Sequence, residues 1–257
     1  MNTLHSEWTK LRTVAGPGWL LVAAIALTAA VGALAANAVS CPDGGCQVDP
    51  AKVSLTGIYL GQAIVAIVAV TAVSGEYSTG MMRLTLIATP RRWLVLAAKA
   101  AVVGTATLVA GAVAVLASVL PGRLLLAGHG IDPAHGYASL SLAGGSVLRA
   151  AAGSVLYLTL IALFSLGIAA AVRDSAVSIG VVLGLLFLFP IVAAAVGDAD
   201  WKRHLDQISP MVAGMYIQAT TDVRSLPLTP WQGLGVLAAW TAGALLAGGL
   251  LLRLRDA

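Results

Sequence analysis

Charged residues are scarce in this 257-residue chain: they make up 10% of it, against roughly 25% in soluble domains. Hydrophobic residues make up 59%, and the mean hydropathy is +0.92. Too little polar material remains to cover the surface of a soluble globule, so a soluble fold is excluded. We therefore expect an integral membrane protein.

Long windows without any charged side chain account for this composition. Six such windows are present, at residues 18–39, 53–73, 100–120, 150–172, 175–197 and 231–252. A transmembrane helix needs about 20 apolar residues, so each window is long enough to span a bilayer. None of the windows alternates between apolar and polar residues as a barrel strand does. We predict an all-α membrane protein, with six transmembrane helices in one domain over residues 1–257.

The distribution of lysine and arginine predicts the orientation. With both termini in the cytoplasm, the inner segments carry nine of these residues and the outer segments six, as the positive-inside rule requires. The formal net charge of +4 then lies mainly at the inner leaflet, where anionic headgroups favour it. The basic balance therefore does not indicate a nucleic-acid partner. An alanine-rich, lysine-poor composition favours a bacterial source, hence the bacterial plasma membrane.

A short amphipathic pattern precedes the first window. Leu4, Trp8 and Leu11 recur at helical spacing, and the charged Lys10 falls on another face. This pattern predicts an interfacial helix over about 3–14, the alternative being a plain basic anchor. The small residues that end the first window also resemble a signal-peptide cleavage site, but the run is long for a signal-peptide core. We expect it to be retained as a span.

The apolar windows lack the residue types needed for catalysis or ion binding, and the chain lacks a nucleotide-binding motif. None of the four histidines and no acidic residue lies within a window, so neither an intramembrane serine–histidine pair nor a midplane ion site can be assembled. None of the four lysines follows a glycine, which excludes a nucleotide-binding P-loop. We predict no catalytic, cofactor-binding or metal site. Glu76, just beyond the second window, could carry a proton, but a carboxylate there more often pairs with a neighbouring arginine.

The two cysteines lie close together between the first two windows. Cys41 and Cys46 enclose a Pro-Asp-Gly-Gly sequence on the expected outer side. Such a segment can close a small disulfide loop, and the alternative is a pair of free thiols.

Glycine and proline positions suggest how the helices pack. Gly57 with Gly61, and Gly180 with Gly184, form two GxxxG patterns that allow close helix approach. Pro190 lies inside the fifth window and should kink that helix.

The connection between the second and third windows is the most informative segment. Ser78 or Thr79 can cap a short helix there, with arginines at 83, 91 and 92 around it. Such a helix can lie on the inner leaflet with its arginines at the headgroups. The alternative is a docking element for a cytosolic partner.

Here the sequence resembles a known family. The stretch Gly-Glu-Tyr-Ser-Thr-Gly-Met-Met-Arg at 75–83, followed by Thr-Pro-Arg-Arg at 89–92 and Ala-Lys at 98–99, is similar to the first cytoplasmic loop of permease subunits of type 2 ATP-binding-cassette (ABC) exporters. Glu-Trp-Thr-Lys-Leu-Arg at 7–12 looks like the elbow helix of that family. Ser-Pro-Met-Val-Ala-Gly at 209–214 and Pro-Trp-Gln-Gly at 230–233 also resemble it, so the resemblance covers nearly the whole chain. The cysteine pair is not part of the family pattern.

The resemblance implies a division of labour. Permeases of this family work as two membrane subunits, in a homodimer or with a related permease, and two separate ATPase subunits bind ATP and magnesium. Their first cytoplasmic loop carries a coupling helix that docks onto the ATPase. Carried over to this chain, the docking residues are Glu76, Tyr77, Ser78, Thr79, Gly80, Arg83, Arg91 and Arg92. The elbow residues are Trp8, Lys10 and Leu11.

The resemblance also implies efflux along a path between two membrane subunits. The few polar groups in the apolar windows that could line it are Thr56, Gln62 and Thr105. Such a surface suits a hydrophobic or amphiphilic solute, for example a drug, a peptide antibiotic or a lipid. Two alternatives stay open: a secondary transporter driven by an ion gradient, and a membrane scaffold that moves no solute.

Overall fold

The computed structural model describes residues 2–13, 15–39, 48–81, 92–135 and 137–254, and every regular element within them is a helix. The helices are α1 (Asn2–Thr13), α2 (Ala15–Ala38), α3 (Pro50–Ser54), α4 (Ile58–Ser78), α6 (Arg92–Gly128), α7 (Gly145–Val172), α8 (Ser175–Ala195), α9 (Ala199–Ile208), α10 (Pro210–Met215) and α11 (Pro230–Leu254). Three short 3-10 turns complete the described part: η1 (Pro133–His135), η2 (Tyr216–Gln218) and η3 (Val223–Ser225).

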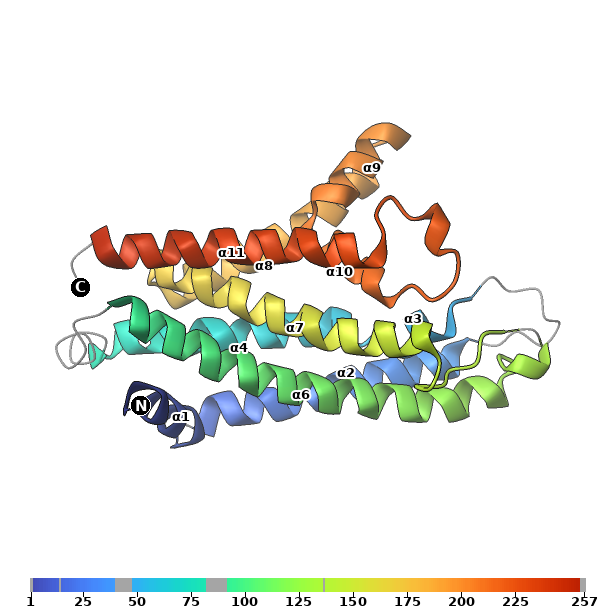
Figure 1. Ribbon diagram of the computed structural model, residues 1–257, viewed down its shortest axis with the longest axis horizontal. Coiled ribbons are helices and arrows are strands. Elements are labelled where there is room, and N and C mark those ends of the chain that lie inside the picture. Colours follow the sequence, from blue (N-terminus) through green and yellow to red (C-terminus); the bar gives the residue numbers. More distant parts are fainter. Residues whose placement is uncertain (1, 14, 40–47, 82–91, 136, 255–257) are drawn as a thin grey trace.

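Within these residues, six helices are long and apolar enough to cross a membrane: α2, α4, α6, α7, α8 and α11. The expected all-α protein with six spans is thereby confirmed. The spans run along the long axis of the molecule, with α1 and the last turn of α11 at the same end (Figure 1). We name this end the inner end and the opposite one the outer end, following the orientation expected from lysine and arginine.

Two of the helices differ most from the windows that predicted them. The second window, 53–73, begins in α3, crosses a turn and continues in α4, which runs on to Ser78. The third window, 100–120, underestimates α6, which starts at Arg92 and ends at Gly128. Lys99 and Arg123 bounded that window, but a helix can continue through charged residues once it leaves the hydrocarbon core. The ends of a span are therefore not marked by the first charge.

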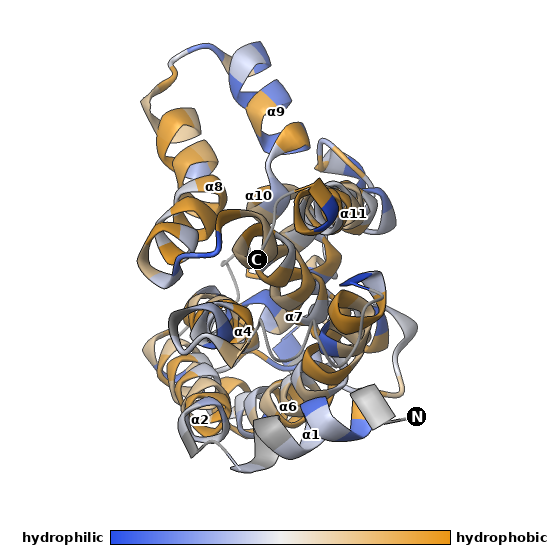
Figure 2. Cartoon of the chain, turned by 90° about the vertical axis from the view of Figure 1, so that its left-hand side faces the viewer, coloured by the Kyte–Doolittle hydropathy of each residue, from blue (hydrophilic) through white to orange (hydrophobic). Residues whose placement is uncertain are grey.

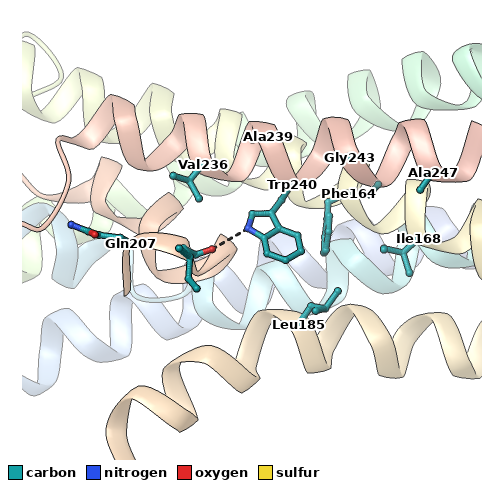
Figure 3. Close-up of a pocket in the computed structure, with 11 residues that line it drawn as sticks. Phe164, Ile168, Leu185, Gln207, Val236, Ala239, Trp240, Gly243 and Ala247 are labelled. Carbon is teal, nitrogen blue, oxygen red and sulfur yellow. Dashed lines mark hydrogen bonds between the residues drawn. The ribbon is translucent and has the colours of Figure 1, made fainter. Parts of the chain in front are cut away.

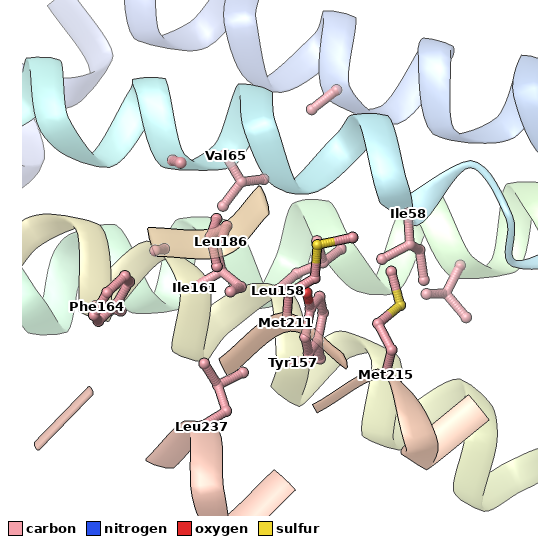
Figure 4. Close-up of a cluster of buried hydrophobic side chains, with 14 of the residues drawn as sticks. Ile58, Val65, Tyr157, Leu158, Ile161, Phe164, Leu186, Met211, Met215 and Leu237 are labelled. Carbon is pink, nitrogen blue, oxygen red and sulfur yellow. The ribbon is translucent and has the colours of Figure 1, made fainter. Parts of the chain in front are cut away.

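Helix α7 forms the centre of the bundle. It packs against α4, α6, α8 and α11, and Figure 2 shows it between the α2–α6 side and the α8–α11 side. Its buried side chains Tyr157, Leu158, Ile161 and Phe164 fill the core between these helices (Figure 4). By contrast, 22% of the most apolar stretch of α2 and of α8 is buried, against 56% in α4 and α7. The outer helices thus leave wide apolar faces for lipid or for another subunit.

The two GxxxG patterns have different surroundings. A Cβ atom added at Gly57 would lie 1.9 Å from the carbonyl oxygen of Thr28, and one added at Gly61 would lie 2.3 Å from its hydroxyl oxygen. The predicted close approach is therefore present between α2 and α4. Around Gly180 and Gly184 on α8, no atom of the described residues lies within 4 Å of the added Cβ.

The outer segment between α8 and α11 begins outside the bundle and returns to it. Helix α9 has no buried residue and projects from the bundle beside the outer end of α8 (Figure 1). Ser209 then caps α10 by accepting a hydrogen bond from the amide of Val212, and Pro210 begins that helix. Helix α10 and the following turn η2 are largely buried. This return places side chains of α10 and η2 against the outer ends of α4 and α8.

Candidate functional site

A buried ion cluster joins three helices at the inner end of the bundle. The ammonium nitrogen of Lys99 on α6 lies 2.7 Å from a carboxylate oxygen of Glu7 on α1 and 2.7 Å from one of Glu76 on α4. It also donates a hydrogen bond to the carbonyl oxygen of Ala72, at 3.3 Å. The exposed fractions of the three charged residues are 3%, 7% and 8%. We call Glu7, Glu76 and Lys99 the inner ion cluster.

The cluster fixes which face of α1 meets the bundle. Glu7 points inward to Lys99, whereas Leu4 and Trp8 are 49% and 48% exposed. A buried charge is costly unless it is paired, so the contact with Lys99 favours this orientation over its alternatives. The exposed apolar side chains remain available to lipid, as an interfacial helix requires.

Two arginines donate hydrogen bonds to the C-terminal end of α11, also at the inner end of the bundle. Arg92, at the start of α6, donates to the carbonyl oxygen of Leu252 at 2.7 Å, and Arg173 donates to that of Leu251 at 3.2 Å. The last carbonyls of a helix have no partner within it, and a cation there also complements the helix dipole. The guanidinium of Arg173 further lies 5.4 Å from the ring centre of Tyr77. The inner ends of α4, α6, α7 and α11 are thus connected.

These contacts involve the helix ends before and after the connection at 82–91, which lies outside the described residues. Helix α4 leads into it through Glu76 and Tyr77, and α6 leaves it through Arg92 and Lys99. Each of these four side chains contacts another helix. A displacement of the connection would therefore act on α1, α7 and α11 as well as on α4 and α6.

Several of the residues expected to form or cap a coupling helix lie at the end of α4. Glu76 and Tyr77 belong to α4, which ends at Ser78. Thr79 is the C-cap of α4, and its amide and its hydroxyl both donate to the carbonyl oxygen of Gly75, at 3.3 and 2.9 Å. These two hydrogen bonds belong to the end of α4. Gly80 has φ +70°, a left-handed conformation that commonly follows the end of a helix.

The remaining predicted docking residues are the arginines at 83, 91 and 92. Arg83 and Arg91 lie outside the described residues, as does the side chain of Ser78. Arg92 is the first residue of α6 and contacts α11.

The elbow prediction is confirmed as far as the helix is concerned. Helix α1 covers Asn2–Thr13, close to the expected range of 3–14. Trp8 is exposed on the side away from the bundle. Lys10 and Leu11 lie within the helix, but their side chains are outside the described part.

The three polar residues proposed for a solute path are not together. Gln62 is fully buried: its amide oxygen accepts a hydrogen bond from the hydroxyl of Tyr157, and its amide nitrogen lies 3.4 Å from the sulfur of Met211. Thr56 lies in the turn between α3 and α4, towards the outer end. Thr105 lies on the inner half of α6, is exposed, and donates to the carbonyl oxygen of Ala101 at 2.6 Å. The structure brings Thr56 and Gln62 into one region and separates Thr105 from them.

A carboxylate connects two loops at the outer end. Asp49 caps α3 by accepting hydrogen bonds from the amides of Ala51 and Lys52. The same carboxylate accepts from the amide and hydroxyl of Thr220, both at 2.6 Å, and from the amide of Thr221 at 3.1 Å. Asp49 therefore fixes the loop before α4 to the loop before α11.

A cavity of about 600 Å³ lies between α7, α8, α9 and α11. Trp240 lines this cavity, and its ring packs edge-to-face against that of Phe164 (Figure 3). The indole nitrogen of Trp240 donates to the carbonyl oxygen of Ile208 at 3.0 Å. The other lining side chains are apolar except Gln207. The cavity suits an apolar group and offers few polar contacts.

The part of the chain that the structure describes contains no site for a metal ion and no cysteine. No group of three or more histidine, cysteine, aspartate or glutamate side chains is placed there to hold a metal ion. Cys41 and Cys46 lie outside the described residues, so their pairing stays a prediction.

Sequence reasoning missed the inner ion cluster and the role of Asp49. Lys99 was counted only as one of the inner positive charges, and the expected partner of Glu76 was an arginine. Among the described residues, the ion pair of Glu76 is with Lys99. A lysine within a long apolar helix, with acidic residues in two other inner segments, was the available signal.

Comparison with known proteins does not narrow the function further. No family model matches this chain, and no curated protein matches it.

Proposed function

We propose that this chain is the membrane-spanning subunit of an ATP-driven exporter and couples to a separate ATPase subunit through the connection at 82–91. The inner ion cluster carries this proposal. It links the helices on both sides of that connection to α1, so a movement imposed there would be distributed through the inner half of the bundle.

Three further observations support the proposal. The motifs on both sides of the connection resemble those of ABC export permeases, and the sequence has no P-loop of its own, so in this proposal ATP is hydrolysed by a partner. The apolar faces of α2 and α8 leave room for a second membrane subunit in the bacterial plasma membrane. The apolar cavity beside Trp240 is compatible with a hydrophobic or amphiphilic solute.

In the proposed cycle, ATP binding closes the partner subunits and moves the connection at 82–91. The inner ends of α4 and α6 follow because Glu76 and Lys99 are held together, and the bundle shifts between inward and outward openings. A ligand can bias such a change only by binding one state better than the other, and ATP does so through the partner.

The test is isolation of the tagged full-length chain from its native membranes in mild detergent, followed by identification of equimolar partners and an ATPase assay. We expect one P-loop ATPase per chain, lost in Arg83→Glu. Arg123→Glu, which changes an exposed arginine of α6 on its outer half, is the matched control and should keep the partner. Glu76→Arg is unsuitable, because it would place a second cation beside Lys99.

Two outcomes would overturn the proposal. Solute flux in liposomes with an ion gradient and no nucleotide would establish a secondary transporter. A complex without an ATPase and without flux would indicate a scaffold.

A further inference from the structure

A second cavity lies at the outer end of the bundle. It measures about 370 Å³ and is bounded by α3, α4, α8, α10 and η2. We call it the outer pocket. Its lining residues are Lys52, Val53, Thr56, Tyr59, Pro190, Met211, Val212, Met215, Tyr216 and Gln218. Its volume is near the lower limit of ligand pockets, about 300–1,000 Å³, so it suits part of a molecule such as a head group.

The lining of the outer pocket is divided between donors and apolar groups. Lys52 is the only charged residue among its lining residues, and no acidic side chain is among them. Met211, Met215 and Pro190 supply apolar surface, and methionine adapts well to irregular apolar groups. This combination favours a ligand with an anionic head and an apolar body.

Gln218 gives a second, independent indication. Its side chain is 3% exposed, and its amide nitrogen has no hydrogen-bond partner among the described residues. Burying an amide donor without an acceptor is unfavourable, so such a group calls for an acceptor from elsewhere. The equally buried amide of Gln62 has protein partners on both of its atoms. The difference indicates that Gln218 is arranged for a ligand.

The neighbouring charges permit an anion. Asp49, the residue before α3, is already engaged by backbone amides and by Thr220. Burial and the nearby carboxylate of Asp206 raise the pKa of Tyr216 to about 12, so its hydroxyl stays protonated and can donate. Lys202 is a second cation near Asp206 and offsets its charge.

We propose that the outer pocket binds the anionic head of an amphiphile that enters from the outer leaflet. The phosphate or carboxylate accepts hydrogen bonds from Gln218, Tyr216 and Lys52. Its first carbons contact Met211, Met215 and Pro190. Lys52 and Tyr59 are exposed and line the pocket, so it reaches the surface and an amphiphile can enter without unfolding of the bundle. Binding at this site requires no ATPase and no transport.

The experiment is native mass spectrometry of the full chain in a neutral detergent, titrated separately with three probes. Dioleoylphosphatidylglycerol carries a phosphate, dioleoylglycerol has the same chains without it, and oleate carries a carboxylate. We expect one retained phosphatidylglycerol or oleate and no retained dioleoylglycerol. The tighter of the two anions identifies the source of the head group. Equal retention of the anionic lipid and dioleoylglycerol would overturn the proposal.

Variants test whether the bound lipid occupies this pocket. Lys52→Gln and Gln218→Leu should each weaken binding by about tenfold, the effect of losing one hydrogen bond to a charged group. Arg123→Gln, at an exposed arginine on the outer half of α6 and outside the lining, is the matched control and should bind as the unmodified chain does. Equal binding by Lys52→Gln and Arg123→Gln would reject the site even if Gln218→Leu failed to fold. Loss of lipid binding with the ATPase partner retained would separate this inference from the proposed function.

Discussion

Lys99 and Glu7 are 92 residues apart in the sequence, yet the ammonium nitrogen of one lies 2.7 Å from a carboxylate oxygen of the other. The pair fixes the N-terminal helix α1 to the inner end of the bundle. By composition alone this helix would only be expected to lie on a membrane. Glu76 shares the same ammonium group, so α1 and the end of α4 depend on one side chain of α6.

The first prediction concerns this shared cation. Lys99→Met leaves two buried carboxylates without their common partner and should destabilise the protein by about 3–5 kcal/mol, the cost of breaking a buried ion pair from one side. Thermal unfolding in detergent would measure it. Lys202→Met, at an exposed lysine of α9, is the control and should have little effect.

A triple variant separates lost pairing from lost packing. Lys99→Met combined with Glu7→Gln and Glu76→Gln removes all three charges together and should recover much of the stability. If the triple variant is no more stable than Lys99→Met, the methylene chain of the lysine, and not its charge, holds α1 in place.

The second prediction concerns the outer loops. Asp49→Ala removes both the cap of α3 and the hydrogen bonds to Thr220 and Thr221, and should cost about 2–4 kcal/mol in unfolding free energy. Asp200→Ala changes an exposed carboxylate of α9 and serves as the control. Thr220→Val should cost less than Asp49→Ala, since it removes one of these bonds. Equal stability of the two aspartate variants would contradict the connecting role.

The third prediction compares the two GxxxG patterns. Gly57→Ala would place a methyl group 1.9 Å from the carbonyl oxygen of Thr28, so α2 must move and stability should fall by about 1–3 kcal/mol. Gly180→Ala meets no atom of the described residues within 4 Å and should leave the folded subunit unchanged. Unfolding of both variants in detergent is the measurement, and a similar loss for both would be inconsistent with these surroundings.

The fourth prediction is a pH dependence at α9. Burial raises the pKa of Asp206 from its usual 3.8, although Lys202 opposes the shift. The folded state therefore binds the proton of the Asp206 carboxyl more tightly than the unfolded state does. Protonation stabilises the fold in acid, and this stabilisation is lost as the pH rises through the raised pKa of Asp206. Asp206→Asn avoids that loss, so it should slow hydrogen exchange of the α9 amides at neutral pH. Below pH 3.8 the two proteins should exchange alike after correction for intrinsic rates, and a difference that persists in acid would exclude ionisation as the cause.

Features with a local signature were predictable from the sequence. The six spans, α1 and the close approach at Gly57 follow from apolar windows, helical spacing and small residues. The true ends of α4 and α6 were not predictable in this way, because a helix continues past the first charge when its partner lies on another element. Glu76 illustrates this: it was placed in a loop and instead belongs to a helix.

The missed parts of the site depend on contacts between distant segments. The ion cluster needs α1 beside α6, and the outer pocket needs α10 to return from outside the bundle to α4 and α8. Neither packing has a signature in the composition of its own segment. Gln218 illustrates this, because nothing in its neighbouring sequence distinguishes it from an ordinary polar turn residue.

Helix α6 has 37 residues, so at 1.5 Å per residue it is about 55 Å long, whereas the hydrocarbon core is about 30 Å thick. It starts at Arg92, directly after the connection at 82–91, and continues past Arg123 towards the outer loops. A tilt of a few degrees at Arg92 would displace the far end of such a helix by several ångströms. Because α6 also contributes the core residues Val103, Val115 and Val119, the same tilt would shift core contacts along its length and link the connection at 82–91 to the outer loops.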